Sequence, residues 1–160
     1  MQAEKIISIE AALTEADYQS AKALFGEYAA SIGIDLAFQK FDDELLQINL
    51  VYGPPNGVLL LVSAGEQPIG CAGIRKFDVT TAELKRMYIQ PAFRGLKLGA
   101  ALLEKCLDVA AALGYQYIRL DTLQEMQAAI QLYKAAGFYE IAPYRFNPLA
   151  GAVFMEKKLG

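Results

Sequence analysis

Residues 83–103 read ELKRMYIQPAFRGLKLGAALL, and this stretch contains most of a strand, a glycine-containing loop and the start of a helix. Residues 82–89 predict a strand that ends at Pro91, and apolar residues at helical spacing predict a helix over 98–114 with Gly114 as its C-cap. The apolar stripe expected on this helix comprises Leu98, Leu102, Leu103, Cys106, Leu107, Ala110 and Leu113. Glycine inside a helix costs roughly 1 kcal/mol relative to alanine, whereas at a helix start it lets the backbone approach a ligand. We therefore expect a ligand in front of this helix.

The chemistry of the loop indicates a phosphorylated ligand. A helix N-terminus carries unpaired N–H groups and roughly half a positive charge, which together favour an anion. Arg94 and Lys97 add side-chain charge, and Gly95 and Gly99 allow close approach of the backbone. Neither the P-loop pattern nor the Rossmann glycine pattern occurs in the chain. The expected ligand is a nucleotide or another phosphorylated molecule.

The rest of the chain predicts one domain that combines strands and helices. Further strands are expected at 5–10, 58–64, 69–77, 115–122, 138–144 and 151–159, and further helices from the capping box at Thr14–Asp17, at 41–46 and at 126–137. Short connections make 58–89 an antiparallel meander, and the strand–loop–helix–strand order of 82–121 implies a parallel pair bridged by a helix. The prediction is a single α/β (α+β) domain over 1–160, with a mixed central sheet of about six to seven strands flanked by helices.

Composition excludes several classes of function. The 160-residue chain has a net charge of −3, so a basic nucleic-acid-binding surface is not expected. It contains no histidine, which removes the usual Ser-His and Cys-His nucleophiles and histidine metal sites. Cys71 and Cys106 form no metal-binding motif. Residues 1–13 have no long apolar stretch and no cleavage signature, so we expect no signal peptide, and the chain has no run of ~18 apolar residues. We expect a cytoplasmic protein without a metal, nucleic acid or membrane partner.

The segment 83–103, together with LYKAAGF at 132–138, resembles the GNAT superfamily of acyl-CoA-dependent N-acyltransferases. The resemblance implies that acetyl-CoA is the acyl donor, that no metal is required and that the loop binds the pyrophosphate of CoA. The residues that it assigns to CoA are Arg94, Gly95, Lys97, Gly99 and Ala100, with Tyr88 and Ile89 beside the pantetheine arm and a backbone N–H around Met87 for the thioester carbonyl. Lys97 stands where the family usually has glycine, and Met126 stands where many relatives have asparagine.

Acyl transfer to an amine requires three proton or charge adjustments. The amine must lose a proton, the thioester carbonyl must be polarised, and the departing thiolate should gain a proton. The resemblance places Tyr133 near the CoA sulfur, and a phenol is a plausible donor to it; the alternative is a purely structural core aromatic. Glu83 is the candidate base, acting through a water, and its alternative is a solvated glutamate on an exposed face. Asp121, at the end of the next strand, is the second candidate base.

The resemblance places the acceptor between residues 31–40 and the loop 142–152. Arg75, Arg145, Tyr28 and Tyr144 could receive an acceptor carboxylate. We expect an N-acetyltransferase that acts on a small amine, for which a carboxylate-bearing amine is one candidate. A protein N-terminus or a lysine side chain is the alternative acceptor. The alternative is a non-catalytic acyl-CoA-binding module. A homodimer is compatible with either function.

Overall fold

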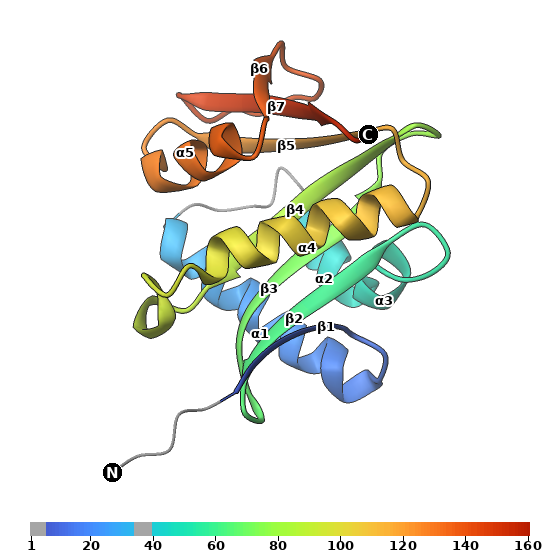
Figure 1. Cartoon of the computed structure of the whole chain (residues 1–160), viewed down its shortest axis with the longest axis vertical. Helices are drawn as coiled ribbons and strands as arrows, with labels where there is room; N and C mark the ends of the chain where they lie inside the picture. Colours follow the sequence, from blue (N-terminus) through green and yellow to red (C-terminus); the bar gives the residue numbers. More distant parts are fainter. Residues whose placement is uncertain (1–5, 34–39) are drawn as a thin grey trace.

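The chain is built on a seven-stranded sheet in the order β1-β2-β3-β4-β5-β7-β6 (Figure 1). The computed structural model describes residues 6–33 and 40–160. Its strands are β1 (Ile7–Ala11), β2 (Val58–Ala64), β3 (Gln67–Lys76), β4 (Thr81–Ile89), β5 (Tyr117–Leu123), β6 (Tyr139–Ile141) and β7 (Ala152–Lys158). Its helices are α1 (Glu15–Ile32), α2 (Phe41–Leu46), α3 (Ile48–Val51), the 3₁₀ turn η2 (Pro91–Phe93), α4 (Leu98–Ala112) and α5 (Gln127–Ala135). The expected mixed α/β architecture is confirmed.

Strands β4 and β5 form the parallel pair, and they pair over only a short length. The four strands from β1 to β4 are an antiparallel meander, and β5 pairs antiparallel with β7, which pairs with β6. The β4–β5 register ends at Glu83–Arg119, after Thr81–Tyr117 and Ala82–Ile118. Beyond this point the two strands move apart, as Figure 1 shows. The separation leaves part of the sheet open between the C-terminal halves of β4 and β5.

Helices cover both faces of the sheet. On one face, α4 buries Leu102, Leu103, Cys106 and Ala110 in a core cluster that also contains Tyr133 of α5. On the other face, α1, α2 and α3 pack over a second cluster, to which α1 contributes Ala21, Leu24 and Phe25. The expected capping box is present, because Thr14 and Asp17 exchange side-chain-to-backbone hydrogen bonds. Within the described ranges, no helix has the combination of length and apolarity needed to cross a membrane.

Several ends of the predicted elements were wrong, among them the C-cap of the helix at 98–114, which is Leu113 and not Gly114. Leu113 was expected on the buried stripe of the helix, but it follows the last residue of α4 as its C-cap and is 37% exposed. The strand expected over 138–144 is shortened to Tyr139–Ile141. In both cases the apolar pattern continues past the point at which the backbone leaves the regular element, so periodicity alone could not locate the end.

The second core cluster depends on close contact between β3 and the ring of Tyr52. This ring is fully buried and stands edge-on to Phe25, with 5.6 Å between the ring centroids. A Cβ added at Gly73 would lie 2.5 Å from Cε1 of Tyr52. Only glycine leaves room for the ring at this position of β3.

We predict that Gly73→Ala lowers the free energy of unfolding by about 1–3 kcal/mol, because the added methyl overpacks the Tyr52 site. Gly26→Ala is the matched control, since a Cβ there meets nothing within 4 Å and the residue lies inside α1. That control should gain about 0.5–1 kcal/mol from helix propensity. Urea unfolding of both variants tests this, and a Gly73→Ala protein as stable as wild type would contradict the packing argument.

Candidate active site

The strand β4 contains a bulge where it borders the opening. The register with β3 passes from Gly73–Lys85 to Cys71–Tyr88, so Ala72 stands opposite both Arg86 and Met87. Arg86 has a φ of 59°, in the left-handed region that non-glycine residues rarely adopt. A bulge redirects the backbone groups of the strand that contains it. Here the bulge lies beside a groove and a smaller cavity, both lined by Met87.

A groove of about 700 Å³ runs from the opening to the start of α4. All eight residues assigned to CoA line it, namely Met87, Tyr88, Ile89, Arg94, Gly95, Lys97, Gly99 and Ala100. The loop that precedes α4 bends at Gly95, whose φ is 86°. Lys97 is the N-cap of α4, and its side chain makes no capping hydrogen bond. The helix N-terminus therefore faces the groove without a side-chain cap, as anion binding requires.

The two basic residues of the loop occupy defined positions. Arg94 donates from Nε to the carbonyl oxygen of Ile89 at 2.9 Å, and its guanidinium lies 5.8 Å from the ring centroid of Tyr88. Lys97 has a φ of 61°, a conformation that favours glycine. The lysine thus adopts a glycine-like backbone path at the position where the family usually has glycine.

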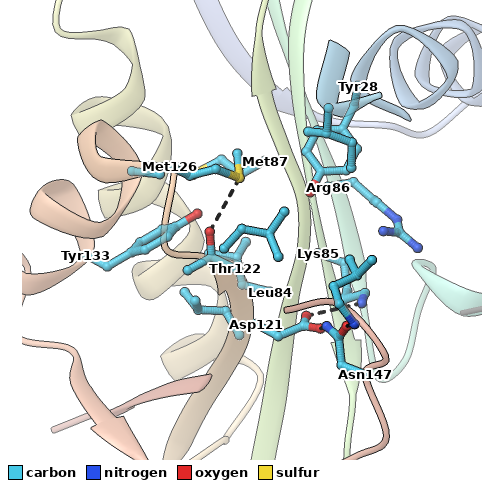
Figure 2. A pocket seen from close by; sticks show the side chains of 15 residues that line it. Tyr28, Leu84, Lys85, Arg86, Met87, Asp121, Thr122, Met126, Tyr133 and Asn147 are labelled. Atoms are coloured by element: carbon cyan, nitrogen blue, oxygen red, sulfur yellow. Dashed lines mark hydrogen bonds and ion pairs between the residues drawn. The ribbon is translucent and has the colours of Figure 1, made fainter. Parts of the chain in front are cut away.

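A smaller cavity of about 90 Å³ lies between the separated strands and contacts the groove. Tyr28, Met87, Met126 and Ala129 line both spaces. Figure 2 shows Tyr133 projecting from α5, with its oxygen toward Met126 and Thr122. Thr122 donates from Oγ1 to the sulfur of Met126 at 3.6 Å. Met126 thus lies at the junction of the groove and the cavity, although its thioether cannot replace the hydrogen-bond donor of an asparagine.

Tyr133 is both a core residue and a wall of the cavity. It is 7% exposed, and its ring packs against Phe138 at a centroid distance of 5.6 Å. Burial raises the pKa of the Tyr133 hydroxyl above its ordinary value, and the nearby Tyr28 acts in the same direction. The phenol is therefore protonated at neutral pH and can donate a hydrogen bond into the cavity.

Glu83 is buried and fully engaged with protein groups. Its carboxylate accepts hydrogen bonds from Tyr144 Oη and Arg145 Nη2, each at 2.8 Å, and Arg75 Nε lies 3.8 Å from Oε1. Its side chain is 0% exposed, so the alternative of a solvated glutamate is wrong. Three of the four residues expected to contact the acceptor thus surround Glu83. The fourth, Tyr28, lines the groove and the cavity.

Lys85, which was not among the predicted site residues, pairs with Asp121 at the cavity wall. Lys85 Nζ lies 3.6 Å from Asp121 Oδ1, and Asn147 donates from Nδ2 to Asp121 Oδ2 at 3.3 Å (Figure 2). Burial lowers the pKa of the Lys85 ammonium. A usable signal was present, because Lys85 follows Glu83 by two positions on a strand and so faces the same side of the sheet.

The segments expected to hold the acceptor are described in part. Residues 34–39 of the expected 31–40 segment lie outside the described residues. The loop between β6 and β7 supplies Tyr144 and Arg145 to Glu83, and Asn147 to Asp121. This loop therefore packs across the sheet face next to the cavity.

Comparison with known proteins agrees with this geometry. The family model described as acetyltransferase (GNAT) family matches residues 19–138. The chain belongs to the GNAT family. A protein of Schizosaccharomyces pombe named as an uncharacterised N-acetyltransferase is 38% identical over 156 residues, which are 96% of this chain and 95% of that protein. A second relative with that description, from Dictyostelium discoideum, is 28% identical and matches 86% of this chain and 93% of its own.

Solved structures share the GNAT fold. An acetyltransferase from Streptococcus agalactiae superposes with a TM-score of 0.79 at 24% identity, covering 96% of this chain and 98% of its own. A Salmonella typhimurium protein solved with its cofactor acetyl-CoA gives a TM-score of 0.70 at 20% identity, covering 97% and 95%. With the family and the N-acetyltransferase relatives, the chain is an acetyl-CoA-dependent GNAT acetyltransferase.

We predict that Arg94→Glu weakens acetyl-CoA binding by at least about tenfold, because a cation beside the expected pyrophosphate site becomes an anion. Calorimetric titration measures the dissociation constant, and the melting temperature should change little. Lys105→Glu is the charge-matched control, since Lys105 is exposed on α4 and does not line the groove. Equal losses of affinity in both variants would mean that the change in net charge, and not the position of Arg94, weakens binding.

Proposed function

We propose that this protein transfers the acetyl group of acetyl-CoA to the amine of a small acceptor by direct attack on the thioester. One observation carries the proposal. The groove lined by all eight residues assigned to CoA meets, at Met87 and Met126, a cavity that holds the side chains of Tyr133 and Asp121. A donor lying in the groove would place its thioester where these groups can act.

The donor is oriented by the loop and by β4. Its pyrophosphate binds at the N-terminus of α4, near Arg94 and Lys97, where the backbone N–H groups and both side chains oppose its charge. The pantetheine arm follows Tyr88 and Ile89. The thioester carbonyl accepts a hydrogen bond from the backbone N–H of Met87, next to the bulge. This donor stabilises the negative charge that develops on the carbonyl oxygen.

In the reaction, the acceptor amine loses two protons and the CoA thiolate gains one. The acceptor loses one proton to become a neutral amine, and its nitrogen forms the C–N bond with the carbonyl carbon. The C–S bond breaks, and the nitrogen gives up a second proton as the amide forms. CoA leaves as a thiolate and takes one proton, so one proton is released overall. No oxidant, reductant or metal is needed for this balance.

Tyr133 assists the departure of CoA. Its raised pKa keeps the hydroxyl protonated but also makes it a weaker acid than free tyrosine. Its main contribution is therefore a hydrogen bond to the developing thiolate, with transfer of the proton completing the step. The buried ring keeps the hydroxyl aimed at the cavity.

Asp121 is the favoured base, and Glu83 is a structural carboxylate. Asp121 lines the cavity with Tyr133, whereas Glu83 lines neither the cavity nor the groove. Both oxygens of Glu83 already accept hydrogen bonds from the β6–β7 loop. Asp121 can receive the amine proton directly or through one water, with Lys85 and Asn147 fixing its orientation.

The acceptor is proposed to be small and to carry an acidic group. Among the described residues, the charged side chains at the cavity are Lys85, which pairs with Asp121, and Arg86, which pairs with Glu44, so the cavity has no excess of carboxylates. This balance favours a carboxylate-bearing amine over a polycation. A screen of amino acids, amino acid derivatives, polyamines and lysine peptides, followed by release of free CoA thiol, tests the proposal. Turnover confined to polycations would contradict the acceptor class, and no turnover with any amine would contradict the function.

We predict that Tyr133→Phe lowers kcat by about 10²-fold, the lower end of the range for loss of a general acid. Affinity for acetyl-CoA and melting temperature should stay close to wild type, because the ring and its packing against Phe138 remain. Steady-state thiol release, calorimetry and thermal unfolding separate these quantities. A variant that loses stability but keeps its rate per folded molecule would support a purely structural tyrosine.

The choice of base is tested by comparing Asp121→Asn with Glu83→Gln. We expect Asp121→Asn to lower kcat by about 10²-fold or more. Glu83→Gln should mainly lower the melting temperature, because it weakens the ties to Tyr144 and Arg145. Rates are normalised to the folded fraction from circular dichroism. The opposite ranking of the two rates would assign the base to Glu83.

A further inference from the structure

Arg86 is held in its left-handed backbone conformation by a buried side-chain network. Its guanidinium donates from Nη2 to Glu44 Oε1 at 2.8 Å and from Nε to Glu44 Oε2 at 3.1 Å. Tyr52 donates from Oη to the same Oε2 at 2.7 Å. Arg86 and Glu44 are 5% and 6% exposed, respectively. A two-point contact of this kind fixes the plane as well as the distance of the guanidinium.

Aromatic rings from α2 and α1 lie against the guanidinium. The guanidinium carbon lies 5.2 Å from the ring centroid of Phe41 at the start of α2 and 5.9 Å from that of Tyr28 in α1. Glu44 also belongs to α2, so this short helix contributes both an ion-pair partner and a ring. An uncommon backbone conformation persists where its surroundings over-determine it, and this condition is met at Arg86.

We propose that Glu44 and Arg86 are positioning residues for acyl transfer, which act by holding the β4 bulge so that the Met87 N–H points at the thioester carbonyl. The inference rests on the proposed function for the reaction step, but the network and the bulge are independent of it. Met87 is the residue directly after Arg86 and lies opposite Ala72 in the bulge. On the other edge, β5 no longer pairs with β4 beyond Glu83, so the neighbouring strand cannot supply this restraint. On the β3 side, Cys71 donates from Sγ to the carbonyl oxygen of Arg86 at 3.3 Å, and the restraint on the Arg86 side chain comes from α2.

Steady-state kinetics test the proposal with four variants. Glu44→Gln keeps the size of the side chain but replaces one acceptor oxygen with a donor, and Asp42→Asn is the control, an exposed carboxylate two positions earlier in α2. We expect Glu44→Gln to lower kcat by about 10- to 100-fold with KM for acetyl-CoA changed less than about threefold, a part of the loss seen when an oxyanion donor is removed. Asp42→Asn should match wild type.

Two substitutions at Arg86 separate backbone positioning from direct contact. Glycine adopts positive φ without steric cost, whereas alanine disfavours it. Arg86→Gly should therefore retain a higher kcat than Arg86→Ala, with rates normalised to the folded fraction. Equal losses in both variants, combined with a raised KM for the acceptor, would mean that the guanidinium binds the acceptor directly and would overturn the proposal.

An NMR measurement gives a readout that does not depend on turnover. Labelling with ¹⁵N-methionine reports the backbone amides of Met87, Met126 and Met155. Met126 lines the groove and reports cofactor binding, while Met155 is fully buried and reports the integrity of the core. In wild type the Met87 signal should move further with acetyl-CoA than with CoA, which has no thioester carbonyl.

In Glu44→Gln the extra Met87 response to acetyl-CoA should be lost, while the Met126 response and the Met155 position remain. A retained Met87 response, or a kcat within twofold of wild type per folded molecule, would overturn the positioning role. If wild type binds acetyl-CoA but acetylates no amine, the proposed function fails, and the Met87 response alone then decides the role of Glu44 and Arg86.

Discussion

The site depends on the parallel pairing of β4 and β5 ending after three residue pairs. Continued pairing would place the backbone of β5 against β4 at Met87 and close the space that holds Asp121 and Tyr133. Strand edges left without a partner have N–H and C=O groups that need hydrogen-bond partners. In this chain those edges border the groove and the cavity, where an extended ligand such as the pantetheine arm can occupy the position of a missing strand.

The two carboxylates Glu83 and Asp121 lie at the opened part of the sheet, and they differ in their partners. Glu83 ties the β6–β7 loop to β4 through Tyr144 and Arg145, while Asp121 faces the cavity beside Lys85. Buried ion pairs contribute little net stability, since desolvation offsets their attraction. Their clearer effect here is geometric: one pair orders a loop over the sheet, and the other orients a carboxylate toward the cavity.

How well a contact could be predicted from the sequence depends on how far apart its two residues are along the chain. The loop at 94–100 and α4 are adjacent in sequence, so glycine placement, charge and periodicity were enough to predict a ligand site at the start of the helix, and the family resemblance added the part of the groove along β4. The partners of Glu83 lie 61 and 62 residues away, and Glu44 lies 42 residues from Arg86. Single-sequence patterns contain no signal for such pairs. The same limit explains why the sequence could not show that Glu83 is buried and bound to the β6–β7 loop.

The groove and the cavity are built from different parts of the chain. Most of the groove comes from the end of β4, the loop and the starts of α4 and α5. The cavity adds Asp121 from β5 and Asn147 from the β6–β7 loop, and the network behind Arg86 comes from α2. Substitutions in α2 or in the β6–β7 loop can therefore change the shape and charge of the cavity while the groove keeps its lining. The bulge at Arg86 is where the groove and the cavity meet, because Met87 lines both and Arg86 is held by α2.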